Sequence, residues 1–332
     1  MTFCTNSTSS AFEPREETDT FLQIVMYLIA IIGILANITV IIVFVNCKIH
    51  RRSFTYLLVF QQSVIDLYAS AHYFIFFCIQ PVPTEKINDA FCKLGTIFLF
   101  FLSASTLNLV FISVERYVAV VYPLKYWIRG NSKRSMIKHL GIPFLAAFII
   151  TVQYAFISEE DIGNPGTCVF CYRSEGLQIL SSVSLLLANA VIPITVMTFC
   201  YRRVYVTLNK QMKVRAELTM QSLTNTTPLR ESSNDARAEN ADTSAQSRRN
   251  DDAERNFIVT MCINTVVYII CVIPLILLYL IYTICQCFDV NNHVSRDIGL
   301  LFVLSNTAVN PFVYAYKFNE YREGFSKTFC QN

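Results

Sequence analysis

The chain has 332 residues, of which 53% are hydrophobic and only 15% charged, and its mean hydropathy is +0.42. Because soluble domains carry about one quarter charged residues, this composition excludes an ordinary soluble domain and indicates a membrane protein. The formal net charge is only +3, and we expect no nucleic-acid partner.

Seven apolar runs are close to or longer than the roughly 20 residues that a helix needs to cross a bilayer. They lie at about 22–45, 56–79, 94–114, 136–157, 179–201, 257–284 and 298–316. Helices satisfy every backbone polar group internally, whereas the short alternating segments typical of a membrane β-barrel do not occur in this sequence. The sequence therefore predicts an all-α membrane protein, built as a seven-transmembrane-helix bundle.

The positions of Lys and Arg predict how the chain is oriented, because loops on the cytoplasmic side are enriched in these residues. If the N-terminus lies outside, 22 of the 27 Lys and Arg residues fall on the cytoplasmic side, and the reverse orientation would invert this ratio. We therefore expect a multi-pass protein of the plasma membrane with an extracellular N-terminus. The sequon at Asn6 then lies outside and is a candidate for N-glycosylation.

The chain divides into an extracellular tail, a bundle and a C-terminal segment, at 1–20, 21–316 and 317–332. Within the bundle, the composition changes over about 207–252 to Ser, Thr, Asn, Arg and acidic residues, which predicts a disordered cytoplasmic loop. In the C-terminal segment, Phe318, Tyr321 and Phe325 share one helical face. This face predicts a short amphipathic eighth helix that lies on membrane lipids.

Two motifs stand at the ends of predicted helices. An acidic-Arg-Tyr sequence at 115–117 follows the third apolar run, and an Asn-Pro-x-x-Tyr sequence at 310–314 ends the seventh. A charged pair at the rim of a membrane helix is costly unless it has polar partners. In these motifs and their order, nearly the whole chain resembles a rhodopsin-like (class A) G-protein-coupled receptor. Within that family, the third span and the residues after it, at 104–123, resemble peptide receptors more than others. The resemblance implies a receptor rather than an enzyme.

The resemblance implies that ligand binding outside moves the sixth span outward and activates a heterotrimeric G protein, with arrestin and receptor kinases as further partners. In the resting state, Arg116 would pair with Glu115 and with Glu254 of the sixth span, because a guanidinium cannot lose its charge. Movement of that span about Pro274 would break this pair. The residues implied in the switch are Glu115, Arg116, Tyr117, Tyr201, Glu254, Pro274, Asn310, Pro311 and Tyr314.

Asp66 lies in the middle of the second span, where a carboxylate marks a functional site by default. Together with Asn37, Ser105, Asn306 and Asn310, it matches positions that line a polar cavity in the receptor family. That cavity often holds a sodium ion, and carboxylate, hydroxyl and amide oxygens suit a hard cation. The resemblance thus implies bound sodium with Asp66 and Ser105 among its ligands, and no other cofactor.

The family joins the start of the third span to the second extracellular loop by a disulfide. Cys92 stands at the first of these places, slightly closer to Arg116 than is usual in the family. The loop offers both Cys168 and Cys171 as partners. We expect Cys92 to pair with Cys171, which lies nearer the fifth span, and Cys168 is the alternative.

The positions that match the family's ligand pocket are apolar or aromatic. Phe98 stands where amine receptors carry an Asp, and Leu304 stands where opsins carry a Lys, so neither ligand class is expected. An apolar pocket with a charged rim suits a peptide or an acidic lipid, although Arg296 at this rim could instead pair with Asp297 or Asp289. The predicted pocket residues are Tyr73, Phe77, Phe98, Leu99, Leu102, Leu275, Tyr279, Tyr282 and Arg296.

Departures from the family pattern leave other interpretations open. Val272 stands where the family usually has a Trp, Tyr268 replaces the usual Phe, and the fourth span lacks its usual Trp. A divergent chemosensory receptor of the same fold is therefore the main alternative. A secondary transporter would show repeat symmetry, and a membrane enzyme would need a nucleophile or a metal cluster within a span. The sequence shows neither feature.

Overall fold

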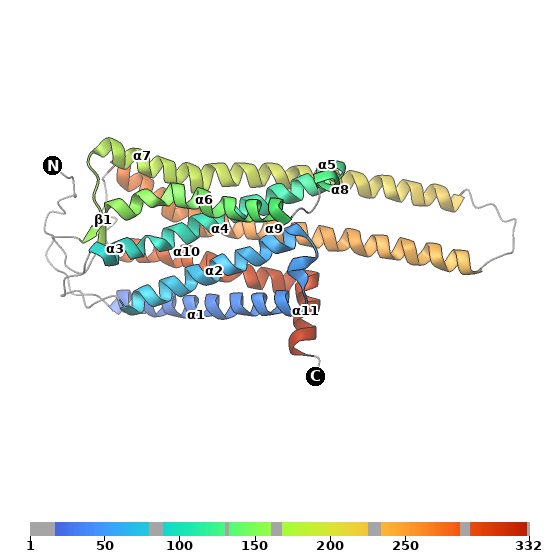
Figure 1. Cartoon of the computed structure of the whole chain (residues 1–332), viewed down its shortest axis with the longest axis horizontal. Coiled ribbons are helices and arrows are strands. Elements are labelled where there is room, and N and C mark those ends of the chain that lie inside the picture. Colours follow the sequence, from blue (N-terminus) through green and yellow to red (C-terminus); the bar gives the residue numbers. More distant parts are fainter. Residues whose placement is uncertain are drawn as a thin grey trace.

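Helices run side by side along the long axis of an elongated bundle (Figure 1). The computed structural model describes residues 17–79, 89–129, 133–160, 168–224, 234–285 and 293–330. The long helices are α1 (Glu17–Asn46), α2 (Phe54–Ile79), α4 (Ile97–Val121), α6 (Lys133–Ile157), α8 (Ile192–Thr224), α9 (Asn234–Cys285) and α10 (His293–Lys317). Each of the seven predicted apolar runs falls on one of these helices and its direct extensions, and the predicted seven-helix fold is confirmed.

Shorter elements extend or connect the long helices. They are the 3-10 turn η1 (Ile49–Arg51), α3 (Asp89–Gly95), α5 (Pro123–Arg129), the strands β1 (Ser158–Glu160) and β2 (Cys168–Phe170), α7 (Glu175–Leu186), the π-helical turn η2 (Leu187–Val191) and α11 (Asn319–Phe329). Helix α3 leads into α4 as the third crossing, and α7, η2 and α8 follow one another as the fifth. We call the end of the bundle that carries β1 and α3 the disulfide end, and the opposite end the α11 end.

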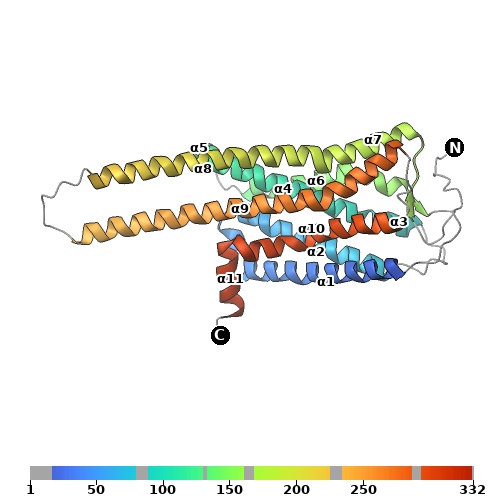
Figure 2. The same cartoon turned by 180° about the vertical axis from the view of Figure 1, so that it is seen from behind.

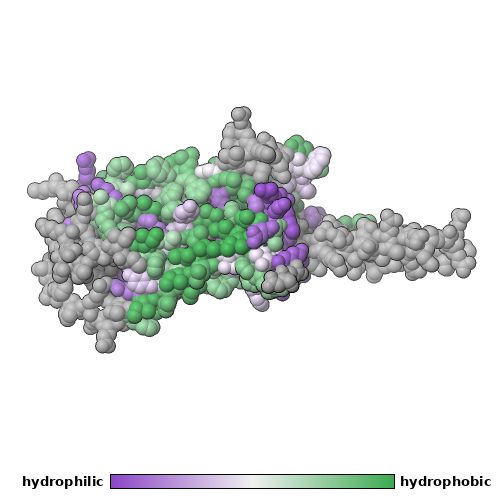
Figure 3. Space-filling view, turned by 60° about the horizontal axis from the view of Figure 1, so that its bottom comes forward, coloured by the Kyte–Doolittle hydropathy of each residue, from purple (hydrophilic) through white to green (hydrophobic). Residues whose placement is uncertain are grey.

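The middle of the bundle carries hydrophobic surface, as the lipid-facing side of a membrane protein requires. Figure 3 shows hydrophobic residues over the centre of one face and hydrophilic residues near the α11 end. Within the described residues, six helices are long and apolar enough to cross a membrane, and α2 is not among them. Helix α2 carries Gln61, Gln62, Ser63 and Asp66, which are all buried inside the bundle, so its polar side chains face other helices.

Helix α11 turns across the end of the bundle instead of continuing along α10 (Figures 1 and 2). Phe318, at the junction, is fully buried, and Tyr321 is also buried, whereas Phe325 is 39% exposed. A Cβ atom at Gly324 would lie 2.8 Å from Val43 of α1, so only glycine lets α11 approach α1 this closely. The predicted eighth helix is therefore present, and its apolar face is shared between the bundle and the exterior.

The segment at about 207–252 differs from the disordered loop expected from its composition. Helix α8 continues to Thr224 and α9 begins at Asn234, so both project well beyond the bundle (Figure 2). These stretches are rich in Ala, Glu, Gln, Lys and Arg, which are strong helix formers. Because each stretch prolongs a helix that already exists, it avoids the unfavourable nucleation step. Residues 225–233, in the middle of the segment, lie outside the described part.

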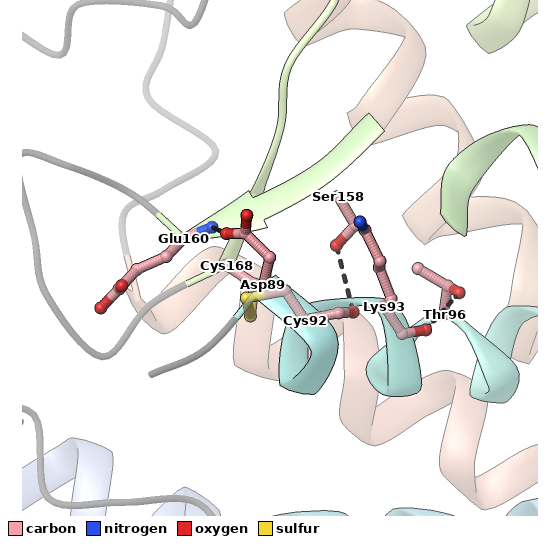
Figure 4. The surroundings of a disulfide bond; sticks show 7 residues. All are labelled: Asp89, Cys92, Lys93, Thr96, Ser158, Glu160 and Cys168. Atoms are coloured by element: carbon pink, nitrogen blue, oxygen red, sulfur yellow. Dashed lines mark hydrogen bonds between the residues drawn. A yellow bond between two sulfur atoms is a disulfide. The ribbon is translucent and has the colours of Figure 1, made fainter. Parts of the chain in front are cut away.

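The disulfide joins Cys92 of α3 to Cys168 of β2, with a Cα–Cα distance of 5.4 Å (Figure 4). The preferred pairing of Cys92 with Cys171 is therefore wrong, and Cys171 belongs to a different disulfide. The strand register explains why Cys168 is the partner. Glu160 of β1 pairs with Cys168, and the backbone N–H of Glu160 donates to the Asp89 carboxylate of α3. This hairpin holds Cys168, and not Cys171, against the start of the third crossing.

We expect peptide mapping to recover Cys92 linked to Cys168. Chymotrypsin cleaves after aromatic residues, so a cut after Phe170 separates Cys168 from Cys171 and makes the assignment unambiguous. A Cys92 peptide linked to the Cys171 fragment would contradict the structure. Because the bridge closes a long loop, with a sequence separation of 76, Cys168→Ser should also lower the free energy of unfolding by about 2–5 kcal/mol.

Candidate functional site

A carboxylate lies at the centre of the bundle, where three helices meet. Asp66 of α2 is fully buried. Its Oδ1 accepts a hydrogen bond from the Ser105 hydroxyl of α4 at 2.8 Å, and its Oδ2 accepts one from the Asn310 amide of α10 at 2.7 Å. The structure therefore brings together three of the five residues predicted to line the polar cavity, and they join α2, α4 and α10.

The other two predicted cavity residues bond elsewhere. The Asn37 amide donates to the backbone oxygens of Gly33 and Thr307, each at 2.9 Å, and so ties α1 to α10. The Oδ1 atoms of Asn37 and Asn306 are buried and have no hydrogen-bond partner among the described residues. Both asparagines belong to the polar interior of the bundle, but neither bonds to Asp66 in the described contacts.

Gln62 is a cavity residue that the sequence analysis missed. Its amide nitrogen lies 3.1 Å from each carboxylate oxygen of Asp66 and 2.5 Å from the Ser105 hydroxyl oxygen. Its amide oxygen accepts a hydrogen bond from Asn108 of α4 at 2.9 Å. Gln62 precedes Asp66 by one helical turn, and residues four apart share a helix face. This spacing is the sequence signal that could have placed Gln62 in the cavity.

Arg116 lies at the α11 end, partly buried, with its guanidinium against aromatic rings. Its Cζ is 3.9 Å from the ring centroid of Phe257 in α9 and 5.7 Å from that of Tyr56 in α2. Its Nε has no hydrogen-bond partner among the described residues. A cation over an aromatic face is attracted by the ring quadrupole. Phe257 therefore holds α9 against the arginine of the 115–117 motif.

The same rings connect Arg116 to α11. The Tyr56 hydroxyl donates to Glu320 of α11 at 2.7 Å. Phe318, at the junction of α10 and α11, lies 5.4 Å from both the Tyr56 and the Phe257 ring centroids. The sequence analysis assigned no role to Tyr56, Phe257 or Glu320. They were missed because they come from three distant places along the chain, in α2, α9 and α11, and only the fold brings them together.

The structure also describes Glu115 and Tyr117, the two neighbours of Arg116 in the 115–117 motif. Glu115 is buried, with 7% of its surface exposed, and the Tyr117 hydroxyl donates to Tyr122 at 3.4 Å. The side chain of Glu254 lies outside the described residues, so its predicted pairing with Arg116 stays a prediction. Of the remaining predicted switch residues, Pro274 and Pro311 lie inside α9 and α10, where each can permit a bend.

Tyr201 of α8 and Tyr314 of α10 both belong to one core cluster, which reaches the α11 end at Phe318 and Tyr321. Tyr314 is fully buried, and its ring centroid lies 6.3 Å from that of Phe318. Tyr201 is 7% exposed and shares this cluster with Phe257. Both tyrosines therefore lie inside the bundle, in the cluster that also contains the ring packed on Arg116.

A second polar link joins the fifth and sixth crossings. The Tyr268 hydroxyl of α9 donates a hydrogen bond to the Asn189 carbonyl in η2, and the Thr106 hydroxyl lies 3.3 Å from the Tyr268 hydroxyl. Asn189 is four residues before Pro193, which has no N–H and cannot donate the usual helical bond to this carbonyl. Tyr268 supplies a donor where the helix lacks one, which gives its departure from the family's Phe a physical role.

The predicted ligand pocket is placed in part. Tyr73, Phe98, Leu102 and Leu275 belong to one apolar cluster, which also contains Leu304. The Tyr73 and Phe98 rings lie 5.4 Å apart. Leu99 is partly buried and is not a member of this cluster. The side chains of Phe77, Tyr279, Tyr282 and Arg296 lie outside the described residues.

A bundle of seven membrane helices, with a polar cavity at its centre and an arginine held at one end, has the architecture of a seven-helix membrane receptor. The chain belongs to the rhodopsin family of 7 transmembrane receptors, whose model matches residues 36–314. The resemblance found in its motifs is thereby confirmed.

Individual relatives are similar to this chain at modest identity. Octopamine receptor beta-2R of Drosophila melanogaster is 27% identical over 93% of this chain and 61% of that receptor. The receptor of the same name from Chilo suppressalis is 26% identical, over 98% and 84%. Cholecystokinin receptor type A of Rattus norvegicus is 28% identical, over 61% and 48%. The chain thus spans less than two thirds of the first and third of these, and their names include both amine and peptide receptors.

Tyr268→Phe should lower the stability of the protein by about 1–3 kcal/mol, because it removes the donor to the Asn189 carbonyl without changing the size of the ring. The apparent melting temperature of the purified protein measures this effect. Tyr205→Phe is a matched control, because Tyr205 is 62% exposed, and it should leave the melting temperature unchanged. Equal melting temperatures for the two variants would show that the Tyr268 bond contributes no stability.

Proposed function

We propose that this receptor converts the binding of an extracellular ligand into outward movement of α9 and activation of a heterotrimeric G protein. Its membership of the rhodopsin family supports this function. The distribution of Lys and Arg supports an orientation in which the α11 end faces the cytoplasm. In the plasma membrane, ligand would then bind near the disulfide end, and the G protein, arrestin and receptor kinases would bind at the α11 end.

The contact between Arg116 and Phe257 is the observation that carries the proposal. A guanidinium in the membrane rim needs partners because it cannot deprotonate. Here the ring of Phe257 covers it at 3.9 Å. Outward movement of α9 would withdraw this ring and leave Arg116 free for a new acceptor. The arrangement is a two-state element whose equilibrium a ligand can bias.

The relay between the two ends runs through α9. Tyr268 bonds to η2 in the fifth crossing, and Phe257, three turns closer to the α11 end, packs on Arg116. Pro274 lies within the same helix, closer to the disulfide end. A ligand that shifts α9 at this bend would therefore change both contacts, because a helix moves as a stiff rod over such a distance. Glu254 would add an ionic contact to Arg116 from the same helix.

A docking surface for the G protein is proposed beside this switch. Helix α5 directly follows α4, which carries the 115–117 motif, and exposes three large apolar side chains. Leu124, Trp127 and Ile128 are 77%, 82% and 76% exposed. Contiguous apolar surface of this kind marks sites of interaction with proteins or membranes. Together with the free ends of α8 and α9, it would form the contact area for the partner.

We propose a peptide or an acidic lipid as the ligand. The Phe98 side chain is buried against Tyr73, so the position that would need a carboxylate to hold an amine instead adds to an apolar cluster. An apolar pocket selects ligands with substantial hydrophobic surface. The names of the relatives support an amine or a peptide ligand, and Phe98 favours the peptide of these two.

Phe257→Ala should raise ligand-independent signalling, because it removes the ring that holds α9 against Arg116. Loss of a cation–π contact shifts the ratio of active to resting receptor by about 2- to 30-fold. Dissociation of G-protein subunits, measured across the main G-protein classes and normalised to surface expression, reports this change. Phe257→Tyr is the matched control, because it keeps the aromatic face and should keep basal signalling low.

Equal basal signalling in the Ala and Tyr variants at equal surface expression would refute the role of the Phe257 ring. Glu254→Ala separates the ionic contribution from the aromatic one. If Glu254 also restrains Arg116, its removal raises basal signalling in the Phe257→Tyr background as well.

The ligand class is tested by screening cells that express the receptor against peptide, acidic-lipid and amine collections. We expect responses to peptides or acidic lipids and none to octopamine, because Phe98 offers no negative charge to an ammonium group. A response to octopamine that survives Phe98→Ala would contradict the pocket assignment. A response that appears only in Phe98→Asp would support it.

A further inference from the structure

We propose that the side-chain amide of Gln62 occupies the cation position beside Asp66, so that the receptor does not bind sodium there. The family resemblance implies a sodium ion in this cavity. The oxygens that such an ion prefers are present in Asp66, Ser105 and the neighbouring asparagines. The hydrogen bonds around Asp66, however, show that another group already fills the position that the ion would take.

The amide nitrogen of Gln62 stands where an ion shared by Asp66 and Ser105 would stand. It lies 3.1 Å from both carboxylate oxygens and 2.5 Å from the Ser105 hydroxyl oxygen. An amide nitrogen has two N–H groups and carries partial positive charge. One group is shared between the two carboxylate oxygens and the other points to Ser105. A cation would have to compete for all three of these oxygens at once.

The carboxylate has no acceptor capacity left over. An ionised carboxylate offers about four lone-pair sites. Oδ1 of Asp66 accepts from Ser105 and from Gln62, and Oδ2 accepts from Asn310 and from Gln62. All four sites are therefore used by side chains of the chain itself, and each donor comes from α2, α4 or α10.

Asn108 fixes which way the Gln62 amide points. The Asn108 amide donates to the Gln62 oxygen at 2.9 Å and to the Leu58 carbonyl at 3.0 Å. Because a carbonyl can only accept, the Leu58 contact requires the nitrogen of Asn108 on that side. The Gln62 oxygen must then face Asn108, which leaves its N–H groups facing Asp66. The opposite orientation would place the Gln62 oxygen against a carboxylate.

Displacing the amide would break the contacts that it makes with Asp66 and Ser105 inside the bundle. Gln62 and Asn108 are both fully buried. An ion bound at Asp66 would take these acceptors from the two Gln62 N–H groups, and a buried polar group that loses its partner costs free energy. Gln62 therefore ties α2 to α4 without an ion, whereas a bound ion would do so only at sufficient sodium concentration.

The experiment compares sodium with a cation too large for the cavity. The purified receptor is heated in detergent in about 150 mM sodium chloride or choline chloride, which keeps the ionic strength equal. The wild-type apparent melting temperature should be the same in both salts. Gln62→Leu keeps the side-chain volume but removes the amide, and should gain about 4 °C in sodium as the freed carboxylate binds the ion.

Gln61→Leu is a matched control at the adjacent position. Gln61 is also buried, but its amide donates to the Leu140 carbonyl of α6 and does not enter the cavity. This variant should show no sodium dependence. A folded Gln62→Leu variant that gains no more from sodium than Gln61→Leu would overturn the proposal.

Line broadening in ²³Na NMR measures binding directly and does not require the Gln62→Leu variant to fold. The wild-type receptor should broaden the sodium signal no more than Asp66→Asn, which lacks the carboxylate charge. Broadening by the wild type that Asp66→Asn abolishes would show a resident sodium site and overturn the proposal. Neither measurement uses a G protein or a ligand, so their outcome is independent of the proposed signalling function.

Discussion

The structure depends on giving partners to the charged groups that the helices carry into the membrane, where no water can replace a missing partner. Asp66 is the strictest case, because it is a carboxylate at the centre of the bundle. Ser105, Asn310 and Gln62 donate to it from α4, α10 and α2. These bonds link the three helices at mid-membrane.

At the α11 end, aromatic rings are the partners of a charged group inside the bundle. The guanidinium of Arg116 meets the rings of Phe257 and Tyr56, and these rings pack on Phe318. Helix α10 connects the two regions, since Asn310 bonds to Asp66 and Phe318 lies two turns further along. A shift of α9 can therefore change the aromatic end while the central carboxylate keeps its bonds. This separation of a rigid centre from a movable end is what a two-state receptor needs.

Much of the fold could be predicted from the sequence, because a helix that crosses a bilayer must be long and mostly apolar. The seven crossings, the eighth helix and the family follow from apolar runs and two motifs. Two features needed the structure: Cys92 pairs with Cys168, which the sequence offered only as the alternative partner, and α8 and α9 extend into 207–252. The disulfide partner depends on strand register. Cys168 and Cys171 are equally plausible partners in the sequence, and the pairing of Glu160 with Cys168 decides between them. The second depends on helices that propagate outward from the bundle.

The sequence by itself determined which helices cross the membrane, that a carboxylate is buried among them, and that an arginine ends the third crossing. These are properties of single segments, and apolar length and charge reveal them. Only the tertiary structure decided what those groups contact. Gln62 fills the cation position because α2 and α4 pack with Asn108 behind it, and Phe257 covers Arg116 because α9 lies across from α4. Contacts between distant segments depend on packing geometry, which no local pattern records.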